Sequence, residues 1–126
     1  MATRKAFNEF FNGYVECALW SSNDDRDKPL DANYSKSDIA KDSLREMKRD
    51  CVKFMRAEKK DLFDFKLEVG RQWSSLGHDF WLTRNRHGAG FWDRGDGDAG
   101  SRLTDAAHDY GSSDLYVGDD GKIHVS

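Results

Sequence analysis

Glycine is distributed so unevenly along this chain that we expect different kinds of structure in its two halves. Nine of the eleven glycines lie at or after Gly77, and no glutamate occurs after Glu68. Glycine weakens helices and glutamate favours them, so we expect helices before residue 77 and turn-rich structure after it. A chain of 126 residues buries one hydrophobic core and is too short for two. The sequence therefore predicts a single domain over residues 1–126, divided into a helical half (1–76) and a second half (77–126).

The first half has the apolar spacing of three amphipathic helices. A stripe runs from Phe7 to Leu19, with Thr3 as a candidate cap, and the polar residues 21–34 then indicate a surface loop. A second stripe continues to Phe54 after "SKSD", which resembles a capping box. Residues 60–75 predict a third helix although Gly70 interrupts them. We interpret the charged residues outside the second stripe as a solvated surface.

The second half changes to short alternating segments. "DFWLTR" and "GFWD", joined by "NRHGA", predict a β-hairpin around residues 78–94. "LTDAAHDYG" predicts a short helix that ends at Gly111, and "DLYVGDDGKIHV" predicts a second hairpin around Asp120 and Gly121. The expected fold class is α+β, in which N-terminal helices pack on a small antiparallel sheet in the order helix, helix, helix, hairpin, helix, hairpin.

Charge and cysteine content argue against several classes of protein. The net charge is −3, which argues against a generic nucleic-acid or membrane binder because such proteins carry an excess of Lys and Arg. Cys17 and Cys51 lie within apolar helical patterns, so we expect buried, reduced thiols. No apolar run is long enough to span a membrane, and the start of the chain lacks a secretory signal. These features predict a cytoplasmic protein that needs no membrane and no cofactor.

Several segments together resemble a known family. The segments "CALWSSNDD", "PLDANYS", "GHDFWLTRNRHGAGFWDRG" and "DLYVGDDGK" occur in this order between about residues 14 and 122. They resemble a family of small uncharacterised accessory proteins encoded by bacteriophages and mobile elements. The resemblance implies a phage gene and the cytoplasm of a bacterial host, and it implies no activity. Arg86, before His87, adds a positive charge where many members have glycine.

The predicted hairpin of residues 78–94 is the candidate binding site. Packing alone explains Phe80, Leu82 and Phe91, but the turn combines cations, an amide and glycines that let a ligand approach the backbone. Bidentate arginines and aromatic side chains suit a phosphate-and-base ligand or a host protein. The candidate partner-binding residues are Trp81, Arg84, Asn85, Arg86, His87, Gly88, Gly90, Trp92 and Arg94.

These features lead to one main hypothesis and two alternatives. The main hypothesis is a phage-encoded, non-enzymatic binding protein that inhibits or modulates a host component, such as a defence system. Its partner is a host protein or a nucleotide-like small molecule, and a homodimer stays open.

A single-stranded nucleic-acid-binding protein is the first alternative. Residues 77–126 hold five Lys and Arg against nine Asp, a difference of −4, so a basic patch would have to be local. The second alternative is a small metal-dependent hydrolase or nuclease, with His78, His87 and Asp93 as weak metal candidates whose spacing matches no known site.

Overall fold

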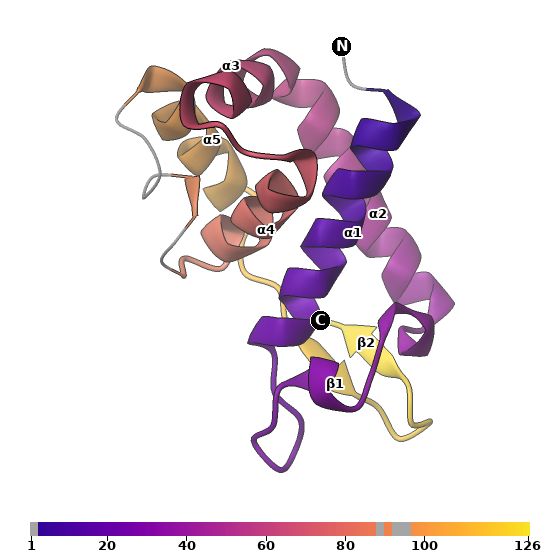
Figure 1. Cartoon of the computed structure of the whole chain (residues 1–126). Coiled ribbons are helices and arrows are strands. Elements are labelled where there is room, and N and C mark those ends of the chain that lie inside the picture. Colours follow the sequence, from indigo (N-terminus) through magenta and orange to yellow (C-terminus); the bar gives the residue numbers. More distant parts are fainter. Residues whose placement is uncertain (1–2, 88–89, 92–96) are drawn as a thin grey trace.

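The computed structural model describes residues 3–87, 90–91 and 97–126. It has the expected α+β fold, in which helices predominate and the strands form a two-stranded antiparallel sheet (Figure 1). No helix in these ranges is both long and apolar enough to cross a membrane. The elements along the chain are α1 (Arg4–Ser21), η1 (Leu30–Ala32), η2 (Lys36–Asp38), α2 (Lys41–Ala57), α3 (Lys59–Val69), α4 (Trp73–Arg84), α5 (Asp98–His108), β1 (Leu115–Val117) and β2 (Ile123–Val125).

The first helices follow the sequence patterns, with shifted boundaries. The Thr3 hydroxyl accepts a hydrogen bond from the Ala6 amide at 3.1 Å, which confirms Thr3 as the cap of α1. The Asp38 carboxylate accepts from the Ser35 amide at 2.8 Å, but this capping box opens the short η2 helix rather than α2. The single helix expected over 60–75 is wrong, because Gly70 adopts φ 68° and ends α3 before α4 begins.

The predicted first strand of the 78–94 hairpin is also wrong, because its residues form the second half of α4. Five consecutive residues of α4, Phe80 to Arg84, are buried, so the helix has no solvent-facing side there. A helix surrounded by protein carries apolar residues all round, and its sequence therefore lacks the stripe by which amphipathic helices are recognised. In the sequence, the short aromatic run at Phe80 to Leu82 therefore cannot be told from a buried β-strand.

Two glycines let α1 and α4 approach until their backbones touch. A Cβ atom added to Gly13 would lie 2.0 Å from the carbonyl oxygen of Ser74, and one added to Gly77 would lie 2.0 Å from that of Phe10. Any other residue would force the two helices apart. Glycine at these positions thus serves helix packing, not a turn.

The core is built around aromatic rings that α1, α2 and α4 contribute. The rings of Phe54 and Phe80 stack with centroids 4.0 Å apart and planes 11° apart, and Phe10 lies within 6.3 Å of both. Cys17 and Cys51 are buried, free thiols, as expected. Helices α1 and α2 therefore pack against α4, which spans the boundary expected at residue 77.

The C-terminal helix and hairpin confirm their predictions. Gly111 follows α5 with φ 73°, and Gly121 adopts φ 79° in the turn between the strands. Leu115 pairs with Val125, which sets the antiparallel register. The hairpin attaches to the start of α2, since the Val125 amide donates to the Ser43 hydroxyl at 3.0 Å.

Candidate functional site

Trp81, expected at an exposed surface, lies in the core. It is 2 % exposed, and its ring packs edge-on against Tyr14 with centroids 5.3 Å apart. The indole N–H donates to the Ser21 hydroxyl at 2.8 Å, so the one polar atom of the side chain is paired. Trp81 anchors α4 to α1 and presents no surface for stacking.

Arg84 is buried in a network that joins α4 to three other parts of the fold. Its guanidinium donates to the Asp50 carboxylate at 2.8 Å and to the Tyr14 hydroxyl at 2.9 Å. It also donates to the carbonyl oxygens of Tyr110 and Gly111, at 3.0 and 2.9 Å. Burial, the largest effect, raises the pKa of Tyr14 well above its ordinary value, so this hydroxyl stays neutral beside the cation. Because its N–H groups donate to these partners within the fold, Arg84 serves the structure and not a ligand.

Asn85 and Gly90 also serve the fold. The Asn85 side chain donates to the carbonyl of Trp81 at 2.9 Å and accepts from the Ser113 amide at 2.7 Å. A Cβ atom on Gly90 would lie 2.1 Å from the hydroxyl oxygen of Thr83. The glycine therefore permits a close approach to α4 rather than to a ligand.

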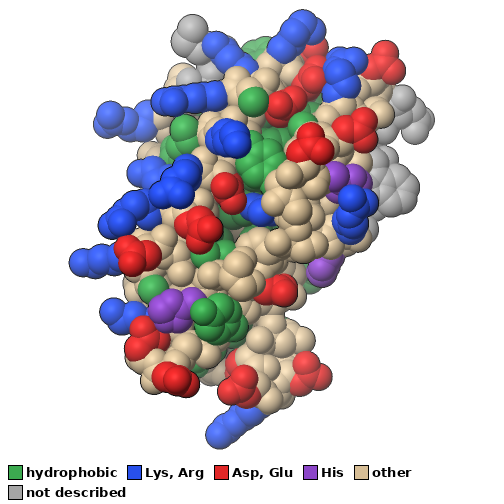
Figure 2. Space-filling view, turned by 180° about the vertical axis from the view of Figure 1, so that it is seen from behind, with side chains coloured by type: hydrophobic (Ala, Val, Ile, Leu, Met, Phe, Trp, Pro, Cys, Tyr) green, Lys and Arg blue, Asp and Glu red, His purple; other side chains and the backbone are tan. Residues whose placement is uncertain are grey.

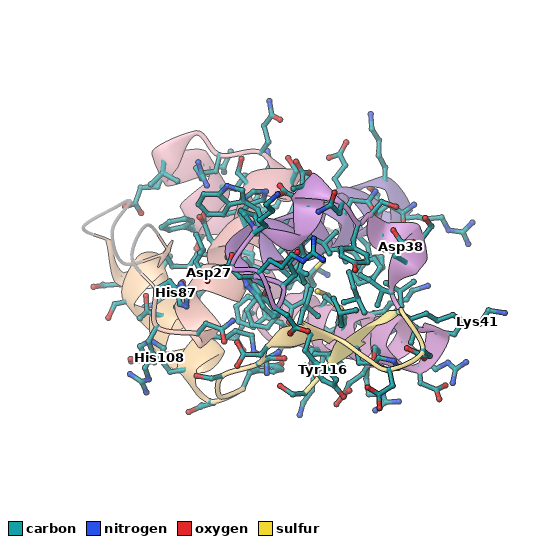
Figure 3. The ribbon with its side chains drawn as sticks, turned by 90° about the horizontal axis from the view of Figure 1, so that it is seen from below. Asp27, Asp38, Lys41, His87, His108 and Tyr116 are labelled. Atoms are coloured by element: carbon teal, nitrogen blue, oxygen red, sulfur yellow. The ribbon has the colours of Figure 1, made fainter. Side chains whose placement is uncertain are left out.

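Of the remaining candidates, only two are exposed residues that the structure describes. Arg86, with φ 59°, and His87 follow the end of α4. Figure 3 places His87 on the side of the molecule away from Lys41. Gly88, Trp92, Asp93 and Arg94 lie outside the described residues.

The metal hypothesis finds no support in the described part of the chain. No group of three or more His, Cys, Asp or Glu side chains there could hold a metal ion. His78 is half-buried on α4. Its neighbour Asp79 is fully buried and accepts hydrogen bonds from Arg71 at 2.9 and 3.3 Å. Asp93, the third candidate, is not among the described residues.

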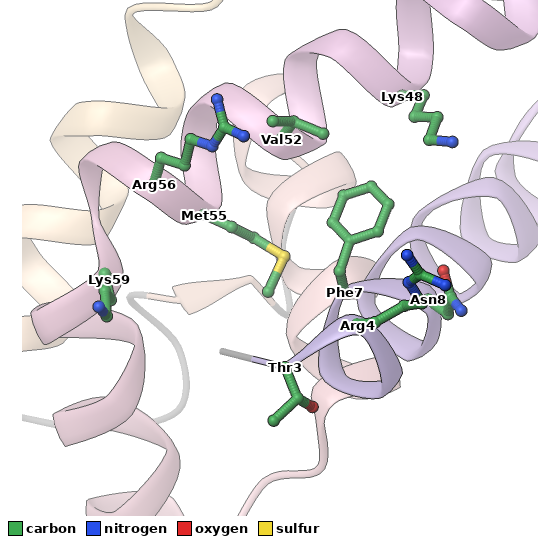
Figure 4. A pocket seen from close by; sticks show the side chains of 9 residues that line it. All are labelled: Thr3, Arg4, Phe7, Asn8, Lys48, Val52, Met55, Arg56 and Lys59. Carbon is green, nitrogen blue, oxygen red and sulfur yellow. The ribbon is translucent and has the colours of Figure 1, made fainter. Parts of the chain in front are cut away.

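The structure instead presents a groove between α1 and α2. It consists of two adjoining hollows of about 670 and 610 Å³, which share Phe7, Asn8 and Lys48. The helices run antiparallel, so the first turn of α1 faces the last turns of α2. Figure 4 shows the larger hollow, with Phe7 and Met55 between the two helices. We call this feature the α1–α2 groove.

The α1–α2 groove is strongly cationic. None of its described lining residues is Asp or Glu. Asp42 stands beside it and pairs with Arg45 at 3.1 Å, an exposed pair of the kind that contributes little. Figure 2 shows Lys and Arg side chains gathered along the edge where α2 lies. Among the described residues, seven exposed cations line the groove: Arg4, Lys36, Lys41, Arg45, Lys48, Arg56 and Lys59.

The spacing of charges along α2 explains this row. Lys41, Arg45 and Lys48 follow one another by four and three residues, so they share one side of the helix. Val52 is the next residue on that side of α2, and it lines the larger hollow together with Arg4 and Asn8 of α1. Residues 36–60 contain nine Lys and Arg against five Asp and Glu. This segment therefore carries a local excess of positive charge, although the net charge of the whole chain is negative.

Sequence reasoning missed this site, although part of its signal was present. The repeat of cations at helical spacing from Lys41 to Lys48 was visible, but a solvated helix face has the same pattern. The contribution of Arg4 was not visible, because only the antiparallel packing of α1 on α2 brings it there.

Comparisons with known proteins do not assign the chain to a family. No protein-family model, curated protein or solved structure matches it.

Proposed function

We propose that this protein is a non-enzymatic nucleic-acid-binding protein that holds the phosphate backbone in the α1–α2 groove. The observation that carries the proposal is the set of seven exposed cations from α1, η2, α2 and α3 along a groove in which no described lining residue is acidic. Along α2, from Lys41 to Arg56, the row extends over roughly 22 Å at the helical rise per residue, which is long enough for several phosphates.

The type of cation favours phosphate over a protein partner. Four of the seven groove cations are lysines. Lysine is depleted at the centres of protein–protein interfaces, whereas Lys and Arg together make most charged contacts to phosphate oxygens. The negative charge elsewhere on the molecule would confine a polyanion to this groove by repelling it from other faces.

Origin and target remain separate predictions. A phage-encoded protein that modulates a host component, including a defence system, stays our expectation for the biological setting. The hairpin expected over residues 78–94 was the predicted contact surface, but its first strand is part of the buried helix α4. We therefore propose the α1–α2 groove as the surface that contacts a partner.

The proposal is tested by fluorescence anisotropy with labelled oligonucleotides over a range of salt concentrations. At physiological salt we expect a Kd in the range of about 10⁻⁴ to 10⁻⁶ M that is typical of non-specific binding, and tighter binding at low salt. If all seven cations contact a single strand, the slope of log K against log salt approaches about −5. Changing Lys48→Gln and Arg56→Gln together should weaken binding and reduce that slope by about 1.4.

The matched control removes the same charge elsewhere. Arg86→Gln with Lys122→Gln changes two exposed cations outside the groove, and we expect binding close to that of the unchanged protein. Equal weakening by both double variants would attribute binding to total charge and contradict the proposal. Absence of binding at low salt would contradict it as well.

A further inference from the structure

We propose that the α1–α2 groove selects single-stranded over duplex nucleic acid, with a base resting on the Phe7 ring and phosphates along the cationic rim. This inference rests on the proposed function and adds the class of nucleic acid and the contact that selects it. It follows from the division of the groove into an apolar floor and a charged edge.

The floor of the groove is apolar. Phe7, Val52 and Met55 line the larger hollow, and Phe7, Phe11 and Leu44 line the smaller one. The cations differ from these residues in being exposed at the ends of long side chains. A ligand that fills the groove therefore needs an apolar surface toward the protein and negative charge along its edges. Single-stranded nucleic acid has both, because its bases are free to turn away from its phosphates.

Phe7 is the residue best placed to contact a base. It lines both hollows, so a strand that follows the groove passes it. Its ring is half-buried and lies nearly parallel to that of Phe11, with 9° between the planes and 6.0 Å between the centroids. This contact with a buried ring limits the rotation of Phe7. A held aromatic ring loses little entropy when a base stacks on it.

Phe11 also carries a cation at the smaller hollow. The ammonium group of Lys36 lies 5.0 Å from the centroid of the Phe11 ring and donates to the Asn12 side chain at 2.9 Å. This arrangement holds one positive charge directly beside the apolar floor. A phosphate bound by Lys36 would therefore leave its base within reach of the rings.

Other polyanions match only one part of the groove. A duplex keeps its bases stacked inside, so only its phosphates would reach the cations and the floor would stay empty. A flat anionic membrane would contact the protruding cations and would not enter the hollows. An acidic helix fits a groove in shape, but the preponderance of lysine favours phosphate over carboxylate partners.

The test compares four probes on the full chain: an oligothymidylate of about fifteen nucleotides, a duplex of the same length, poly-glutamate, and phosphatidylserine vesicles. We expect the single strand to bind about tenfold more tightly than the duplex at equal salt. Phe7→Leu should remove about this factor for the single strand, as expected for loss of one stacking contact, and leave duplex binding unchanged. Tyr116→Leu, which removes an exposed aromatic ring from β1, is the matched control and should change neither affinity.

Photocrosslinking supplies a second readout that does not depend on a substitution. A strand carrying iodouracil should crosslink to Phe7, as mapped by mass spectrometry of peptides, and crosslinks only at other aromatic residues would overturn the inference. Equal affinity for strand and duplex, with no effect of Phe7→Leu, would overturn it and leave the proposed function standing. Binding of poly-glutamate or vesicles without binding of either nucleic acid would overturn both.

Discussion

Arg84 of α4 and Asp50 of α2 form an ion pair at 2.8 Å, with only 6 % of the Arg84 side chain exposed. The same guanidinium reaches the Tyr14 hydroxyl of α1 and two carbonyl oxygens after α5. One side chain from the motif that most resembles a binding loop thus connects four segments of the fold. Its role can be separated from ligand binding by measuring stability.

Replacing Arg84 should destabilise the protein strongly. Arg84→Met leaves Asp50 and two carbonyl groups without their donor, and losing one partner of a buried pair costs about 3–5 kcal/mol. Because Asp50 is 30 % exposed, we expect the lower end of that range, measured as the free energy of unfolding in urea. Arg86→Met, at an exposed position two residues later, should change stability by less than about 0.5 kcal/mol. Equal stability of the two variants would contradict a structural role for Arg84.

Adding one methyl group at Gly77 should disrupt the contact between α1 and α4. The Cβ atom of Gly77→Ala would lie 2.0 Å from the Phe10 carbonyl oxygen, so the helices must separate, at a cost of about 1–3 kcal/mol or more. Thermal unfolding followed by circular dichroism measures the loss. Ser101→Ala, on the exposed side of α5, is the control, and a fall in stability no larger than that of the control would show that α1 and α4 do not approach so closely.

The pairing of Asp61 with Arg102 predicts a dependence of stability on pH. Hydrogen bonds from Arg102, at 2.8 and 2.9 Å, hold the pKa of Asp61 below its ordinary value of 3.8. A carboxyl group whose pKa is lowered in the folded state stabilises the protein when the pH is above the ordinary pKa of that group. This stabilisation is lost as the pH falls through the folded-state pKa. Arg102→Gln should therefore be less stable than the unchanged protein at neutral pH, and the difference should shrink below about pH 4. A difference that stays constant over this pH range in urea titrations would indicate packing instead of charge.

The two thiols should be unreactive in the folded protein. Burial raises the pKa of Cys17 to about 12 and that of Cys51 well above its ordinary value, so almost no thiolate, the reactive form, exists near pH 8. We expect alkylation by iodoacetamide only in urea, with a midpoint that matches unfolding. Since both values are raised, stability should also decline as the pH rises above the ordinary thiol value of 9.0. Rapid labelling of either cysteine without urea would contradict this burial.

The sequence alone was sufficient for features that depend on near neighbours. The cap at Thr3, the left-handed glycines at 111 and 121, and the stripe of α1 each depend on a few residues along the chain. Helical periodicity and turn chemistry operate over this short range, and the α+β class follows from their order.

Only the tertiary structure decided the identity of α4 and of the groove. The run from Phe80 to Arg84 is compatible with a strand or with a buried helix, and the choice is made by α1, which meets Gly77 at backbone distance. Arg4 and Lys48 lie far apart in the sequence, and antiparallel packing places both at one hollow. A cationic surface assembled from several elements exists only after they pack, because no single segment carries all of its charges.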